Sequence, residues 1–124
     1  RMTSRVESRN VTPSDRPGSM GALPAEASLI AKRLAHALRA QAVYLFGSHA
    51  RGEAGPDSDL DFLVIVHESS ASRYVRGIEA RRAVRDIFVP KDIVVLTRDE
   101  WDAERPVACS LASTVEREGI KLHG

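Results

Sequence analysis

Cysteine is almost absent from this sequence, since Cys109 is the only one among its 124 residues. A single cysteine cannot form a disulfide within the chain, which favours a reducing compartment, and the cytoplasm is the expected location. No apolar run approaches the roughly 20 residues that a membrane-spanning helix needs. The basic N-terminus also lacks the apolar segment of a secretory signal peptide. We therefore expect neither a disulfide-built secreted scaffold nor a membrane protein.

An excess of charge of either sign is also missing. Lysine and arginine number 18 against 17 acidic residues, so the formal net charge is +1. Because a dedicated nucleic-acid binder usually carries a strong basic field, no such role is expected. Aromatic residues make up only 5% of the chain, and the single tryptophan, Trp101, is interpreted as a packing anchor rather than a base-stacking platform. With 43% hydrophobic residues, the chain suits one globular domain.

The first 20 residues differ from the rest of the chain. They contain Pro13, Pro17 and Gly18 among many small polar and charged residues, and they show no apolar periodicity. Such a segment cannot bury enough apolar surface to offset the cost of ordering it. We predict a disordered segment over residues 1–20 and a single domain over residues 21–124.

The remaining sequence alternates between helical and strand-like patterns, which predicts an α/β (α+β) fold with a small mixed sheet of three to four strands flanked by helices. Three short runs rich in β-forming residues predict strands, and a fourth, near the C-terminus, predicts a short edge strand: Ala42–Phe46, Leu60–Val66, Ile93–Leu96 and Ile120–Leu122. Apolar spacing of three to four residues predicts helices from Pro24 to about Ala40, from about Ser70 to Phe88, and from near Glu100 to Gly119 with a break at Pro106.

The helix predicted over residues 70–88 has an imperfect apolar phase. Its larger apolar residues are Tyr74, Ile78, Val84 and Phe88. It also carries four arginines, at positions 76, 81, 82 and 85. The simplest interpretation of these arginines is a solvated basic face, and a surface for a polyphosphate or an acidic partner is the alternative.

Two carboxylates begin the most apolar of these strands. Asp59 and Asp61 are two residues apart, so on a strand their side chains point to the same face. Two like charges side by side are unfavourable unless a cation lies between them. The pair therefore predicts a site for a hard cation bound through oxygen.

The predicted topology brings a third carboxylate to the same place. A helical crossover favours parallel pairing of the two strands that begin near Asp61 and Asp92, and parallel strands begin at the same edge of a sheet. An antiparallel first strand would end at that edge with Gly47 and Ser48, a turn suited to phosphate. The alternative for each aspartate is a cap or a salt-bridge partner, but the trio together predicts Mg²⁺ or Mn²⁺ rather than zinc.

These residues resemble a known signature. Gly47 and Ser48 are followed by ten residues and then by Asp59-Leu60-Asp61. In this spacing the chain resembles the minimal nucleotidyltransferases of the DNA polymerase β-like superfamily. The flanking Ala50-Arg51-Gly52, the serine before the first carboxylate, the KDIVV context of Asp92 and the closing EREGIKLHG are also similar. The resemblance extends from about Pro24 to His123.

The resemblance implies roles for individual residues. The catalytic and metal-binding residues that it implies, for two Mg²⁺ or Mn²⁺ ions, are Asp59, Asp61 and Asp92. The nucleotide-binding residues that it implies are Gly47, Ser48, Arg51 and Ser58. In this scheme the glycine and serine hold the β- and γ-phosphates of ATP, and Asp92 activates the acceptor hydroxyl.

The resemblance also implies a partner. The chain is similar to small family members that lack an appended helical domain and are encoded beside a HEPN-domain protein. Such a protein transfers AMP from ATP to a tyrosine of the HEPN ribonuclease toxin and acts as the antitoxin of a type VII-like toxin–antitoxin pair. Two alternatives remain open at this point: a non-catalytic antitoxin that neutralises a helical partner by binding it, and a nucleotidyltransferase that modifies small molecules such as aminoglycosides.

Overall fold

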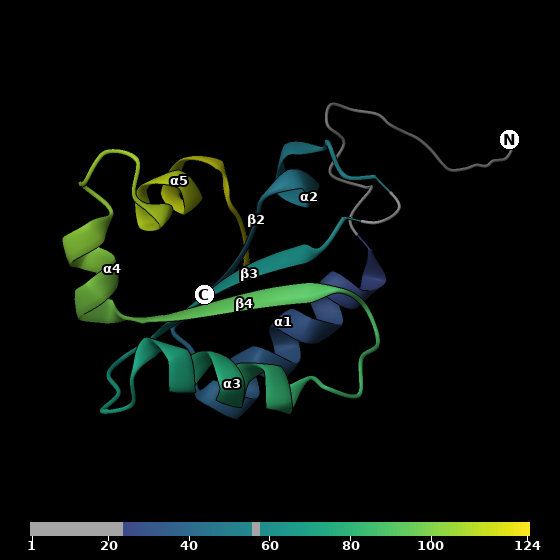
Figure 1. Ribbon diagram of the computed structural model, residues 1–124, viewed down its shortest axis with the longest axis horizontal. Helices are drawn as coiled ribbons and strands as arrows, with labels where there is room; N and C mark the ends of the chain where they lie inside the picture. The colour runs from purple at the N-terminus through teal and green to yellow at the C-terminus, as the bar shows by residue number, and fades with distance from the viewer. Residues whose placement is uncertain (1–23, 56–57) are drawn as a thin grey trace, which may run out of the picture.

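A four-stranded mixed sheet with helices on both faces forms the fold of the computed structural model, which describes residues 24–55 and 58–124 (Figure 1). The predicted disorder of residues 1–20 lies outside the described residues. The elements in chain order are α1 (Ala25–Leu38), β2 (Ala42–Phe46), α2 (Ser48–Arg51), β3 (Leu60–Val66), α3 (Arg73–Ala83), β4 (Lys91–Thr97), α4 (Arg98–Glu104), α5 (Leu111–Glu118) and β5 (Ile120–His123). The predicted fold class is confirmed.

The strand order is β4-β3-β2-β5. As the sequence predicts, β2 pairs antiparallel with β3, and β3 pairs parallel with β4 across the α3 crossover. The predicted C-terminal edge strand is present as β5, which pairs antiparallel with β2. The apolar run of β3 therefore lies in the interior of the sheet, covered on both faces, which explains why it shows no polar alternation.

Two hydrophobic clusters cover the two faces of the sheet. Phe62 and Val64 of β3 pack into the cluster of α1 and α3, whereas Leu63 and Ile65 pack into the cluster of α4 and α5. Figure 1 shows α1 and α3 below the sheet and α4 and α5 above it. Trp101 belongs to the second cluster and stacks on Tyr44 at 5.5 Å between ring centroids, which makes it a packing anchor. In the described part of the chain, no helix is long and apolar enough to cross a membrane.

Helix α3 differs from its prediction in length and in phase. It ends at Ala83 instead of Phe88, and the side chains of Tyr74 and Phe88 are 75% and 91% exposed. The inward positions of the helix include two small residues, Gly77 and Ala80. The apolar pattern misled because small residues let this helix approach the sheet closely, so large apolar side chains do not mark its buried face.

Arg76 is buried, so the prediction that all four arginines of this segment are solvated is wrong for this one. Its Nη1 and Nη2 donate to the two carboxylate oxygens of Glu100 at 2.8 and 3.0 Å. Nη1 also donates to the carbonyl of Val95 at 2.7 Å, and Nε to the carbonyl of Ala71 at 3.0 Å. All three guanidinium nitrogens of Arg76 therefore donate hydrogen bonds, and a buried charge is tolerated when its donors are paired in this way. The other three arginines are exposed, as predicted.

This ion pair predicts a pH dependence of stability. The hydrogen bonds from Arg76 lower the pKa of Glu100 from 4.5 to about 2. The folded-state pKa is depressed, so the stabilisation is fully present above pH 4.5 and is lost as the pH falls toward 2. We expect a loss of about 2 kcal/mol, less than the full shift implies because 31% of the Glu100 side chain is exposed to screening solvent. Urea unfolding across this pH range measures it.

The matched variants for this experiment are Glu100→Gln and Glu79→Gln. Glutamine at position 100 cannot titrate, so Glu100→Gln should lack this part of the acid-induced loss of unfolding free energy. Glu79 is exposed on α3, so Glu79→Gln should lose as much unfolding free energy as wild type. If the unfolding free energy of wild type and of Glu100→Gln fell equally with pH, Glu100 would not be the source of the pH dependence.

Candidate active site

The predicted site lies at the sheet edge where β2 ends and where β3 and β4 begin. Asp61 of β3 is the register partner of both Phe46 in β2 and Asp92 in β4, so the two carboxylates project from adjacent strands on the same face. This is the face that α4 and α5 cover at the opposite end of the strands. Near the carboxylates, α2 follows directly from β2 (Figure 1).

Gly47 brings the backbone into direct contact with Asp61. Its φ of 80° and ψ of −156° lie in a region that essentially only glycine occupies. A Cβ atom added to Gly47 would overlap Oδ2 of Asp61. The absence of a side chain at position 47 therefore leaves the space that the Asp61 carboxylate itself occupies.

The electrostatics of Asp61 indicate a place for a cation. Partial burial raises the pKa of Asp61, and the negative charges of Asp92 and then Asp59 raise it further. His49 and Arg51 lower it, but the net direction is upward. The folded chain thus holds carboxylates together at an electrostatic cost, a combination that favours a functional site.

The three carboxylates gather at one edge without forming a closed cage. Asp59 and Asp92 are exposed, and Oδ1 of Asp92 accepts a hydrogen bond from the amide of Ile93 at 3.1 Å. Across residues 24–55 and 58–124, no three acidic, histidine or cysteine side chains are close enough to hold an ion by themselves. The oxygen-only donors still suit Mg²⁺, which is usually bound by one or two carboxylates together with substrate phosphates and water.

The predicted nucleotide-binding residues differ in their surroundings. Gly47 and Ser48 lie at the carboxylate edge, and Ser48 is the first residue of α2. Arg51 is exposed and pairs with Glu53, with 2.9 Å between Nε and Oε1. The hydroxyl of Ser58 accepts a hydrogen bond from the amide of Gly55 at 2.9 Å, an interaction that shapes the loop.

Sequence reasoning missed three charged or polar residues near this edge. His49 Nε2 lies 3.3 Å from the carbonyl oxygen of Ser58, and its position inside the Gly-Ser motif is a signal that could have found it. Arg81 of α3 lies 3.8 Å from Asp92, and Glu118 of α5 lies 3.8 Å from Arg51. The sequence indicates Arg81 only as one of four arginines that could face a polyphosphate or an acidic partner, and Glu118 only as part of the closing EREGIKLHG. Their contacts with Asp92 and Arg51 come from tertiary packing.

Known proteins with a similar sequence or fold are nucleotidyltransferases and toxin–antitoxin complexes. The family profile described as a nucleotidyltransferase domain matches residues 28–122. No curated protein matches the chain. A crystal structure of a Sulfolobus solfataricus protein described as a nucleotidyltransferase superposes with a TM-score of 0.54 at 24% identity, covering 77% of this chain and 74% of that one.

Two further solved structures are toxin–antitoxin complexes. One is a complex with AMP-PNP, with a TM-score of 0.50 at 23% identity over 82% of this chain and 74% of that one. The other is a mutant of the toxin–antitoxin MntA-HpeT, with a TM-score of 0.52 at 24% identity over 80% of this chain and 73% of that one. At these identities the likeness establishes the fold alone.

Proposed function

The chain belongs to the nucleotidyltransferase domain family, and from this premise we propose that it transfers AMP from ATP to a tyrosine hydroxyl of a HEPN ribonuclease toxin, acting as the antitoxin of a type VII-like pair. The observation that carries the proposal is the contact of Gly47 with Asp61, whose register partner is Asp92. The neighbouring complex with AMP-PNP supports an adenine nucleotide as substrate, and both toxin–antitoxin neighbours support a protein partner.

The reaction is an in-line displacement at the α-phosphorus of ATP. The tyrosine oxygen forms a bond to this phosphorus while the bond to the bridging oxygen breaks, and pyrophosphate leaves with that electron pair. The carboxylate of Asp92 accepts the phenolic proton. Mg²⁺ or Mn²⁺ held by Asp59, Asp61 and Asp92 would supply stabilisation of the charge on the attacking and leaving oxygens.

The turn at Gly47 serves the nucleotide in this proposal. Without a side chain at this position, the Asp61 carboxylate lies directly against the turn, so a phosphate group held by the backbone of the turn would lie next to Asp61. The hydroxyl of Ser48 can donate a hydrogen bond to a phosphate oxygen. These two contacts would orient the triphosphate so that its α-phosphorus faces the acceptor at Asp92.

The direct test uses ATP labelled at the α-phosphate, Mg²⁺ and a HEPN-domain protein as the candidate acceptor. We expect label on one partner tyrosine, loss of label when that tyrosine is changed to phenylalanine, and retention with Asp99→Asn, a variant of an exposed aspartate in the first turn of α4. If the partner binds but no label transfers, the non-catalytic antitoxin is correct instead. Label on small hydroxylated acceptors alone would favour a small-molecule nucleotidyltransferase.

A further inference from the structure

An open groove lies between α3 and β4, next to the carboxylate edge. It has a volume of about 290 Å³ and is lined by Arg73, Tyr74, Gly77, Arg81, Ile93 and Val94. We propose that this α3–β4 groove binds an extended acidic segment of the protein acceptor and thereby presents the acceptor's hydroxyl to Asp92. The proposal rests on the transfer reaction proposed above and adds where, and by what chemistry, the acceptor is recognised.

The groove adjoins the site through two contacts of Asp92. Arg81 lines the groove, and its Nη1 lies 3.8 Å from Oδ1 of Asp92. Ile93 also lines the groove, and its amide donates to that same carboxylate oxygen. A segment lying in the groove would therefore have its end beside the carboxylate that accepts the phenolic proton.

The shape of the groove suits an extended peptide. β4 is the last strand on this side of the sheet, and the end strand of a sheet is a surface on which extended segments dock. Gly77 contributes no side chain, so the space over the carbonyl of Ile93 stays open on the α3 side. Tyr74 lines the groove and is 75% exposed, so its aromatic ring is accessible to an occupant.

The charge of the groove favours an acidic occupant. Two of its six lining residues are arginines and none is acidic. Arg73 is already paired with Glu104 at 2.7 Å and lies 3.8 Å from Glu100. Within residues 24–55 and 58–124, the one ion pair of Arg81 is its 3.8 Å contact with Asp92. Arg81 therefore retains donors for an incoming carboxylate.

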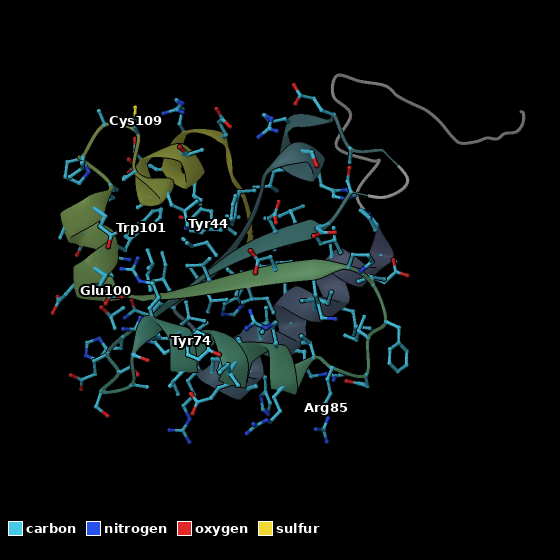
Figure 2. All side chains as sticks on the ribbon, viewed as in Figure 1. Tyr44, Tyr74, Arg85, Glu100, Trp101 and Cys109 are labelled. Carbon is cyan, nitrogen blue, oxygen red and sulfur yellow. The ribbon has the colours of Figure 1, made fainter. Side chains whose placement is uncertain are left out.

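A nucleic acid is the less suitable occupant. The basic residues do not form a continuous stripe: Arg85, four residues after Arg81, projects away from the sheet (Figure 2). The formal net charge of the chain is only +1. Phosphate backbones are bound through many such contacts, and two arginines beside an apolar strand edge do not supply them.

Two synthetic peptides test the proposal, each with one tyrosine, one flanked by glutamates and the other by lysines. AMP transfer from labelled ATP gives kcat/KM, and fluorescence anisotropy gives binding without turnover. We expect the acidic peptide to be favoured by at least about tenfold in both measurements and its advantage to fall with added salt. Equal values for the two peptides would overturn the proposal, as would a labelled single-stranded RNA that binds while the acidic peptide does not.

Charge variants at one exposed position separate docking from folding. Tyr74→Glu places a negative charge in the groove and should raise KM for the acidic peptide about tenfold, with kcat little changed, whereas Tyr74→Lys should not. Val75→Glu is the matched control, because Val75 is 42% exposed at the next helical position and does not line the groove. An equal loss from Tyr74→Glu and Val75→Glu would indicate a general charge effect and would contradict the groove.

The outcomes distinguish this inference from the proposed function. If the acidic peptide binds and Tyr74→Glu weakens its binding about tenfold, but no peptide receives AMP, the docking surface stands and the transfer reaction fails. If both peptides receive AMP with equal kcat/KM, the transfer reaction stands and the groove proposal fails.

Discussion

Replacing Asp61 by asparagine should lower nucleotidyl transfer at least about a thousandfold, because the charge at the centre of the carboxylate edge would disappear. Asp61 is the strand partner of Asp92 and touches the Gly47 turn, so no neighbouring carboxylate can replace it. Asparagine keeps the size of the side chain, which confines the change to charge. Transfer of labelled AMP to the protein partner measures the effect, and Asp99→Asn should retain activity.

The same substitution should leave the fold as stable as before or make it more stable. Burial, Asp92 and Asp59 all raise the pKa of Asp61, which means that ionising this carboxyl group costs more free energy in the folded chain than in the unfolded chain. Removing that charge relieves the repulsion, so Tm should be unchanged or higher for Asp61→Asn. If Asp61→Asn transferred AMP at a rate within tenfold of wild type, Asp61 would not be a catalytic residue. A lower Tm would contradict the electrostatic interpretation.

Gly47→Ala should reduce both stability and activity. The backbone at Gly47 has a φ of 80° and a ψ of −156°, a combination that alanine adopts only with strain of order 1–3 kcal/mol. The added Cβ would also overlap Oδ2 of Asp61, so the carboxylate or the turn must move. A displacement of this kind at a reacting centre costs about a hundredfold in rate. Urea unfolding and AMP transfer measure the two effects.

A glycine in the following loop provides the control. Gly55 has no atom within 4 Å of the position that a Cβ would take, so Gly55→Ala adds a methyl group in open space. This variant should unfold and transfer AMP like wild type. If Gly47→Ala behaved in the same way, the close approach of the turn to Asp61 would have no role in nucleotide binding.

Much of the site could be predicted because its residues lie close together in the sequence. Gly47, Ser48 and Asp59 lie in the single connection between β2 and β3, and Asp61 lies at the start of β3, so the antiparallel pairing of these two strands is sufficient to place them together. Asp92 is farther along the chain, but one parallel crossover, which has a strongly preferred hand, was enough to add it.

Side chains that act across elements could not be predicted in this way. In the sequence, Arg76 cannot be told from three surface arginines. It is buried because it donates hydrogen bonds to Glu100 and to the carbonyl of Val95, which belong to elements later in the chain. The sequence gives Arg81 the same interpretation, yet this side chain lies 3.8 Å from Asp92 because α3 packs against β4. Nothing in the periodicity of residues 70–88 distinguishes these two arginines from Arg82 or Arg85.

The sequence by itself determined the strands, their pairing and the group of carboxylates beside a glycine turn, because these depend on local spacing and on the few topologies that short connections allow. Only the tertiary structure decided which arginine is buried, which one contacts the third carboxylate, and that a groove lies along β4. These features depend on how closely a helix packs against a sheet, and small residues such as Gly77 and Ala80 set that distance without leaving a mark in the hydrophobic pattern.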